Sequence, residues 1–141
     1  MADEPQFAPI EVYLTVKGGN KASKFYQKAF GAKETYRQLA DDGKLLLHCN
    51  LAMFGGQIML SDEFPGDHDV QSPKSRGGPS VTVHINLRKA ADVNQVMTKA
   101  KKAGAKVTMK AADTFWGMRY GRLVDPFGHS WSFGAASPKK A

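Results

Sequence analysis

The chain has 141 residues, 42% of them hydrophobic, which is enough for one globular domain with a sizeable core. No apolar run approaches the roughly 20 residues that a membrane-spanning helix needs. The N-terminal residues also lack the basic and apolar regions of a signal peptide. The single cysteine, Cys49, cannot form an internal disulfide and suits a reducing compartment. We therefore expect a cytoplasmic protein with no membrane partner.

A formal net charge of +7 raises the question of a nucleic-acid partner. Most of the excess lies in residues 88–110, which contain seven Lys or Arg and one Asp, and Lys139 and Lys140 add a basic tail. No aromatic residues interleave with these lysines, as they do in proteins that bind single strands. A solvated outer face of the second long helix therefore explains the charge better than nucleic acid, and an anion- or nucleic-acid-binding surface on that helix is the alternative.

The first half of the chain predicts a strand, a helix and three further strands. Apolar and polar residues alternate in "IEVYLTV" (10–16), as in a strand with one buried face. A helix follows, with Asn20 expected to cap its beginning and Gly31 to end it. The three further strands are expected over 33–40, 44–54 and 57–61.

The second half repeats this pattern after a connector over 63–79 that is rich in Pro, Gly and Asp. "SVTVHINL" (80–87) alternates like the first strand, and a helical stripe leads to Gly104. Three further strands are expected over 105–110, 115–125 and 129–134. Because "GAK" follows the helix in both halves, we interpret the chain as two copies of one β-α-β-β-β unit. The expected single domain, 1–141, thus comprises modules over 10–62 and 80–134, the connector, and a basic tail over 135–141.

The segment "DTFWGMRYGRLVDPFGHSW" (113–131) combines a turn signal with two glycines inside an expected strand. Asp125-Pro126-Phe127-Gly128 has the profile of a type I turn, which places Trp131 on the helix-facing side of its strand. Gly117 and Gly121 permit a bulge or the close approach of a ligand or partner chain. Cys49 alternates with apolar neighbours and is expected in the core.

The other face of the expected strands carries polar or mixed side chains. In the first strand of each half these are Glu11, Tyr13 and Thr15, and then Thr82, His84 and Asn86. If the two units curl together, these residues line a shared concave surface. A solvent-facing sheet gives the same alternation, so the pattern leaves both possibilities open.

The duplicated unit with "FYQKAFGA", "IMLSDEFP", "KKAGAKV" and "FWGMRYGRLVDPFGHSW" in this order resembles the vicinal oxygen chelate superfamily. That superfamily includes glyoxalase I, extradiol dioxygenases and bleomycin-resistance proteins, and the resemblance is greatest to its PhnB-like branch. The resemblance implies an α+β fold in which two tandem βαβββ modules form an open, eight-stranded, cup-shaped mixed sheet with the helices outside. It also implies a homodimer that completes the cup.

The resemblance further implies four positions for metal ligands, on the first and last strands of each module. Carried over by strand position, they fall on Glu11, Met59, Thr82 and Ser132. Only Glu11 is a competent ligand for a divalent cation, since thioethers and neutral hydroxyls bind hard cations weakly. His84 is the alternative to Thr82 as a ligand, and holding a metal then needs help from His48. We therefore expect no complete metal site and no cofactor; if a metal binds, Glu11 and His84 are its expected ligands.

The preferred hypothesis is a protein that binds a small organic ligand in the cup. The residues expected to contact the ligand are Glu11, Tyr13, His48, Met59, Thr82, His84, Trp116, Arg119 and Ser132. The alternative is an enzyme of the same superfamily, of lyase, isomerase or dioxygenase type, in which Glu11 and His84 assist a metal or act as acid and base. A structural role is also open for both, with Glu11 paired to Arg119 or Arg122 and His84 satisfied in the core.

Overall fold

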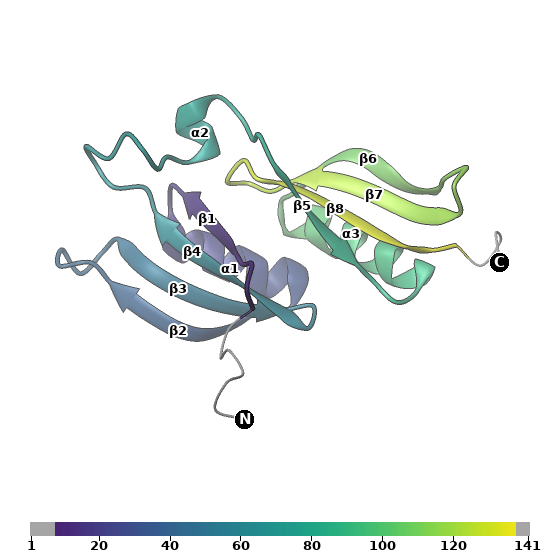
Figure 1. Ribbon diagram of the computed structural model, residues 1–141, viewed down its shortest axis with the longest axis horizontal. Coiled ribbons are helices and arrows are strands. Elements are labelled where there is room, and N and C mark those ends of the chain that lie inside the picture. The colour runs from purple at the N-terminus through teal and green to yellow at the C-terminus, as the bar shows by residue number, and fades with distance from the viewer. Residues whose placement is uncertain (1–7, 138–141) are drawn as a thin grey trace.

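The computed structural model describes residues 8–137, which contain eight strands and three helices. The first module consists of β1 (Val12–Val16), α1 (Gly19–Phe30), β2 (Lys33–Leu39), β3 (Leu46–Met53) and β4 (Gly56–Asp62). The connector contains the short α2 (Pro73–Arg76). The second module consists of β5 (Thr82–Asn86), α3 (Ala90–Ala103), β6 (Lys106–Asp113), β7 (Met118–Val124) and β8 (Ser130–Ala136). The predicted βαβββ order is confirmed in both halves (Figure 1).

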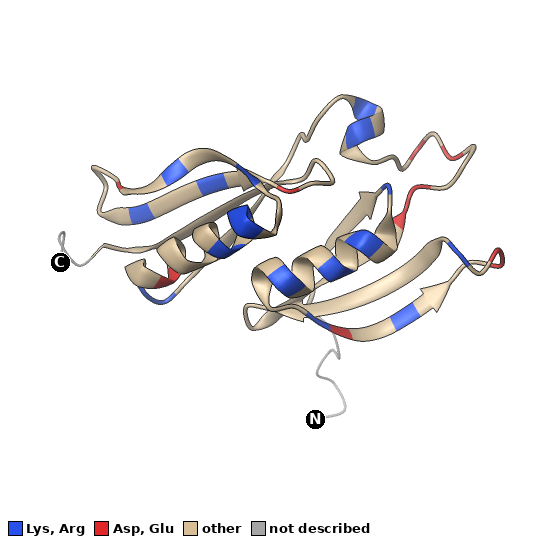
Figure 2. Ribbon diagram, turned by 180° about the vertical axis from the view of Figure 1, so that it is seen from behind, with Lys and Arg blue, Asp and Glu red and all other residues tan. Residues whose placement is uncertain are grey.

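The eight strands form two four-stranded mixed sheets, with the orders β1-β4-β3-β2 and β5-β8-β7-β6. In each sheet the first and last strands of the module are parallel, and the other pairs are antiparallel. β1 and β5 are therefore edge strands, and they lie toward the middle of the molecule (Figure 1). Both long helices cover the same side of the two sheets, as the view from behind shows (Figure 2). Within residues 8–137, neither of these two helices covers the opposite side of either sheet.

The start of α1 depends on a carboxylate from the end of β4. Asp62 accepts hydrogen bonds from the backbone N–H groups of Gly18 and Gly19, at 3.0 and 2.8 Å. These are donors that a helix N-terminus leaves without an intrahelical partner. A Cβ on Gly19 would lie 2.8 Å from Asp62 Oδ2, so a larger residue would push the carboxylate away. Asn20, the predicted cap, lies inside the helix instead.

A single core joins the two modules, because α1 packs on the sheet of the second module. Phe30 lies 4.8 Å from Trp131 and 5.5 Å from Phe133 between ring centroids, and Tyr26 lies 5.6 Å from Trp131. Trp131 and Phe133 are fully buried on the helix-facing side of β8, as the alternation of that strand predicts. Aromatic contacts of this kind add specific geometry to the free energy of apolar burial.

The turn between β7 and β8 supplies a second buried carboxylate, and this one connects the modules. Asp125 is 3% exposed. Its Oδ1 accepts from the backbone N–H groups of Phe127 and His129, at 2.8 and 3.1 Å. Its Oδ2 accepts from Trp131 Nε1 at 2.8 Å and from the Tyr26 hydroxyl of α1. Four donors replace the water that this carboxylate loses on burial, which is the condition for burying such a group.

The hairpin between β6 and β7 differs from its prediction. β7 begins at Met118, and the residues before it form a turn in which Gly117 has a φ of 89°. Phe115 and Trp116 therefore lie in the loop, 88% and 59% exposed, rather than inside a strand. Within β7, Gly121 makes room for Met97 of α3, since a Cβ there would lie 3.0 Å from the methionine Cε. Gly121 thus allows the close approach of a side chain from α3 of the same chain.

Cys49 lies in the core, as predicted, and is fully buried. Its Sγ donates to Glu34 Oε1 at 3.2 Å, and the same oxygen accepts from the Ser23 hydroxyl. Burial raises the pKa of the Cys49 thiol to about 12, and the neighbouring carboxylate adds to the shift. The thiol is therefore neutral at physiological pH and is no candidate nucleophile.

Tyr26→Phe should lower the free energy of unfolding by about 1–3 kcal/mol, because it removes one donor from the buried Asp125 carboxylate. Burial and this carboxylate raise the pKa of the Tyr26 phenol well above its ordinary value, so the hydroxyl remains a donor up to high pH. Urea unfolding followed by circular dichroism measures the loss. Tyr36→Phe is the matched control, since the exposed Tyr36 hydroxyl donates to the exposed side chain of Gln38 and not to a buried carboxylate. Equal losses in the two variants would contradict the role of Asp125.

Cys49 should make stability depend on pH in the alkaline range. The pKa of the unfolded thiol is ~8.5, whereas the pKa of the folded thiol is about 12. Between these values the unfolded chain releases a proton that the folded chain keeps, so stability falls as pH rises, by at most about 1.4 kcal/mol per pH unit. Cys49→Ala should show a shallower decline in urea titrations from pH 8 to 10. Parallel pH profiles for the variant and the wild type would refute this assignment.

Candidate functional site

The uncovered face of the first sheet carries four of the residues predicted to contact a ligand. Tyr13 pairs with Met59 across β1 and β4, so their side chains lie on the same face. Tyr13 Oη lies 2.8 Å from His48 Nδ1, and the two rings meet edge to face. Glu11 immediately precedes β1 and accepts from Gln57 Nε2 at 2.8 Å. The alternative that pairs Glu11 with Arg119 or Arg122 is therefore wrong within one chain.

The uncovered face of the second sheet carries Thr82, His84 and Ser132. His84 Nδ1 lies 2.8 Å from Ser132 Oγ, and His84 Nε2 lies 3.0 Å from Asn86 Oδ1. Both ring nitrogens thus have neutral partners that hold the imidazole across the strands. Thr82 Oγ1 lies 3.0 Å from Ser130 Oγ. This face can offer hydroxyl, imidazole and amide groups to a ligand.

Aromatic side chains extend this face along β7. The His84 ring stacks on Tyr120, with centroids 6.0 Å apart and planes 22° apart. Gly134 allows this position, because a Cβ there would lie 3.1 Å from His84 Cε1. The ring centroid of Trp116 lies 6.5 Å from that of Tyr120. The Trp116 ring thus lies at the end of the face, although the residue belongs to the hairpin loop. Tyr120 was not among the predicted residues.

Arg119 does not lie on this face, and its role as a ligand contact stays a prediction. Its Nε donates to Asn94 Oδ1 of α3 at 3.0 Å, and its Nη1 lies 3.4 Å from Asp113 Oδ1, both on the helix side. Arg122 lies on the uncovered face instead, where its Nη2 donates to Thr82 Oγ1 at 2.7 Å. Since side chains alternate along a strand, Arg119 and Arg122 point to opposite faces of β7.

The four positions that the resemblance implies for a metal do not fit a divalent cation. Glu11 is the only anionic donor among them, and Thr82 accepts from the Arg122 guanidinium, which brings a positive charge to the position. Ser132 is bonded to His84. Among residues 8–137, no group of three or more His, Cys, Asp or Glu side chains is placed to hold a metal ion.

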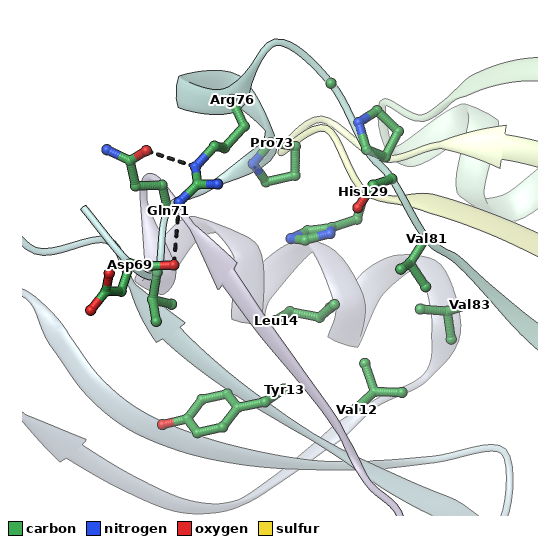
Figure 3. Close-up of a pocket in the computed structure, with 14 residues that line it drawn as sticks. Val12, Tyr13, Leu14, Asp69, Gln71, Pro73, Arg76, Val81, Val83 and His129 are labelled. Carbon is green, nitrogen blue, oxygen red and sulfur yellow. Dashed lines mark hydrogen bonds between the residues drawn. The ribbon is translucent and has the colours of Figure 1, made fainter. Parts of the chain in front are cut away.

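A cavity of about 380 Å³ lies between β1, the connector and the beginning of β5 (Figure 3). Apolar side chains of the two edge strands line one side of it, namely Val12, Leu14, Val81 and Val83. His129 lines it as well, and its Nε2 lies 2.9 Å from the Thr15 carbonyl oxygen. Tyr13 is the only predicted site residue that lines the cavity. The connector shows no periodicity from which this cavity could be foreseen.

Several basic residues lie along both long helices, on the side of the molecule opposite to the uncovered faces (Figure 2). The exposed lysines of these two helices are Lys21, Lys24 and Lys28 of α1 and Lys99, Lys101 and Lys102 of α3. The charge is thus not confined to the second helix, where it was expected. The aromatic residues of α1 are buried and do not lie among the lysines. A nucleic-acid surface here stays a prediction, as does the basic tail, whose Lys139 and Lys140 lie outside the described residues.

The described part of the chain contains no helix long and apolar enough to cross a membrane.

Comparisons with known proteins agree with this architecture. The chain is 41% identical over 133 residues to the uncharacterized protein Mb0911c of Mycobacterium bovis, covering 93% of this chain and 83% of that protein. The same identity relates it to Rv0887c of Mycobacterium tuberculosis, with 93% and 74% covered.

Solved structures share the fold at low sequence identity. A PhnB protein from Bacillus cereus superimposes with a TM-score of 0.71 at 18% identity, covering 92% of this chain and 100% of that one. The fosfomycin resistance protein FosX of Listeria monocytogenes, solved with Mn(II) and sulfate, gives 0.67 at 15% identity, with 94% and 95% covered. The model of the Glyoxalase/Bleomycin resistance protein/Dioxygenase superfamily matches residues 7–133, and the chain therefore belongs to that superfamily.

Proposed function

We propose that the protein binds a small organic ligand on the uncovered faces of its sheets. One observation carries the proposal: the second sheet presents His84, Tyr120 and Trp116 as an aromatic surface beside the hydroxyl groups of Thr82 and Ser132. Small-molecule sites combine apolar or aromatic walls with a few oriented polar groups in this way. On the helix-facing side of β8, by contrast, Trp131 and Phe133 are fully buried in the core.

The polar groups of this face are already oriented by their mutual hydrogen bonds. His84 is held by Ser132 and Asn86, and it stacks on Tyr120. A ligand that stacks on these rings does not have to order them first, which lowers the entropic cost of binding. A planar ligand suits the surface, since flat rings offer large contact areas.

We further propose a homodimer in which a second copy of the chain completes the cup. β1 and β5 are edge strands, and an edge presents unpaired backbone groups that can bind another chain. Apolar side chains beside these edges are exposed: Ile10 is 89% exposed, Val81 70% and Tyr13 51%.

The single cysteine is buried at Cys49 and suits the reducing cytoplasm in which we place the protein.

The enzyme alternative depends on the same assembly. Glu11 and His84 belong to different sheets and have neutral partners, Gln57 for the first and Ser132 and Asn86 for the second. They serve as an acid and base pair only if the two faces meet around one ligand. Binding on the second sheet needs no such meeting and is therefore the preferred function.

A thermal-shift screen of aromatic and heteroaromatic compounds tests the ligand proposal. Compounds that raise the melting temperature of the wild type should bind at least ten-fold more weakly to His84→Ala and to Trp116→Ala, because each variant removes part of the stacking surface. His68→Ala is the control, since His68 lies in the connector and, among the described residues, its backbone carbonyl rather than its side chain is bonded. The proposal fails if no compound shifts the wild type or if every hit binds both variants unchanged.

Sedimentation equilibrium tests the dimer. We expect twice the 15.4 kDa of one chain at micromolar concentration. Val81→Lys, which places a charge beside the β5 edge, should weaken the dimer at least ten-fold. Leu39→Lys adds the same charge at the opposite edge strand, β2, where the side chain is 40% exposed, and should leave the mass unchanged. A monomer at all concentrations, or equal dissociation by both variants, would exclude this assembly.

A further inference from the structure

We propose that the ligand of this face carries a carboxylate group, which Arg122 binds, next to an aromatic ring that stacks on His84 and Tyr120. The inference rests on the proposed function and adds the chemical class of the ligand. It depends on the charge of the uncovered face of the second sheet.

Arg122 has only neutral partners. Its Nη2 donates to Thr82 Oγ1 at 2.7 Å, and its Nη1 donates to the Tyr120 hydroxyl at 3.2 Å. A guanidinium has five N–H donors, so three are left for another acceptor. The ion pairs of the described residues join Arg37 with Glu34 and Arg119 with Asp113, and neither involves Arg122. This part-buried cation thus has no carboxylate partner within residues 8–137.

The surroundings of Arg122 do not supply a negative charge. The four strands of the second sheet contain one acidic residue, Asp113, which bonds to Arg119 and to the Ser137 hydroxyl. Across the strands, Arg122 pairs with Ser132, and Ser132 pairs with His84. A partly buried charge without a counter-charge is unfavourable, and an anionic ligand would relieve that cost. Charge-assisted hydrogen bonds to a carboxylate are also stronger than the neutral ones that Arg122 now makes.

The geometry also relates the cation to the aromatic surface. Arg122 bonds to the hydroxyl of Tyr120, whose ring stacks with His84. A carboxylate on the guanidinium therefore lies beside a ring on this stack. Two hydroxyl groups lie beside the guanidinium, since Thr82 Oγ1 accepts from Arg122 and lies 3.0 Å from Ser130 Oγ. An aromatic acid satisfies both features, whereas a neutral aromatic compound satisfies only one.

Two probes that differ in charge test the proposal by isothermal titration calorimetry: 2-naphthoate and its neutral analogue 2-naphthamide. The wild type should bind naphthoate roughly ten- to hundred-fold more tightly than the amide, as for a hydrogen bond to a charged group. Arg122→Gln should remove this preference, because it weakens the binding of naphthoate much more than that of the amide. Arg119→Gln is the matched control on the opposite face of β7, and it should keep the preference. Arg122→Lys retains the positive charge without the paired donors of the guanidinium, and it should keep part of the preference for naphthoate.

The remaining outcomes separate this inference from the proposed function. Equal binding of both probes to the wild type, weakened by His84→Ala, overturns the carboxylate site and keeps the ligand face. Binding of neither probe overturns the carboxylate site, and the thermal-shift screen then decides on the ligand face. Circular dichroism reports whether Arg122→Gln folds. If it does not fold, the preference for naphthoate is compared between Arg122→Lys and Arg119→Lys, and the proposal requires a smaller preference in Arg122→Lys. If Arg122→Gln and Glu11→Gln dissociate the dimer alike and leave naphthoate binding intact, Arg122 pairs with Glu11 of a second copy, which also overturns the carboxylate site.

Discussion

The buried carboxylate of Asp125 is the interaction on which the arrangement of the two modules depends. It accepts hydrogen bonds from its own turn, from Trp131 of β8 and from Tyr26 of α1, so one side chain joins both modules. Around it, Tyr26 and Phe30 pack against Trp131. The helices of both modules consequently share one core and lie on one side of the sheets. That leaves the other side of both sheets free for function.

The two uncovered faces have the same architecture and different chemistry. The first contains Glu11 together with the hydrogen-bonded Tyr13 and His48. The second contains Arg122 together with His84 and its partners. Two copies of a βαβββ unit therefore provide one scaffold and two different chemical surfaces. A duplicated fold can change one face without changing the core, because side chains of opposite faces alternate along each strand.

Strand alternation predicted most of the candidate site, and its limits are visible in β7. A period of two puts Tyr120 and Arg122 on one face of β7 and Arg119 on the other. The prediction nevertheless included Arg119 among the ligand contacts and extended the strand through Trp116, which lies in the loop before Met118. The partner of Glu11 is a different case. Gln57 comes from another strand, and only the register of β1 with β4 brings the two side chains together.

The sequence by itself determined the two βαβββ units, the buried face of each strand, the turn at Asp125 and the core positions of Trp131 and Cys49. These features follow from local periodicity and from the preferences of turn residues, which act between near neighbours in the chain. Only the tertiary structure decided that α1 packs on the second sheet, that Asp62 caps α1 and that the connector closes a cavity against β1. Each of these joins residues far apart in the sequence, and such contacts depend on how whole elements pack, which no local pattern encodes.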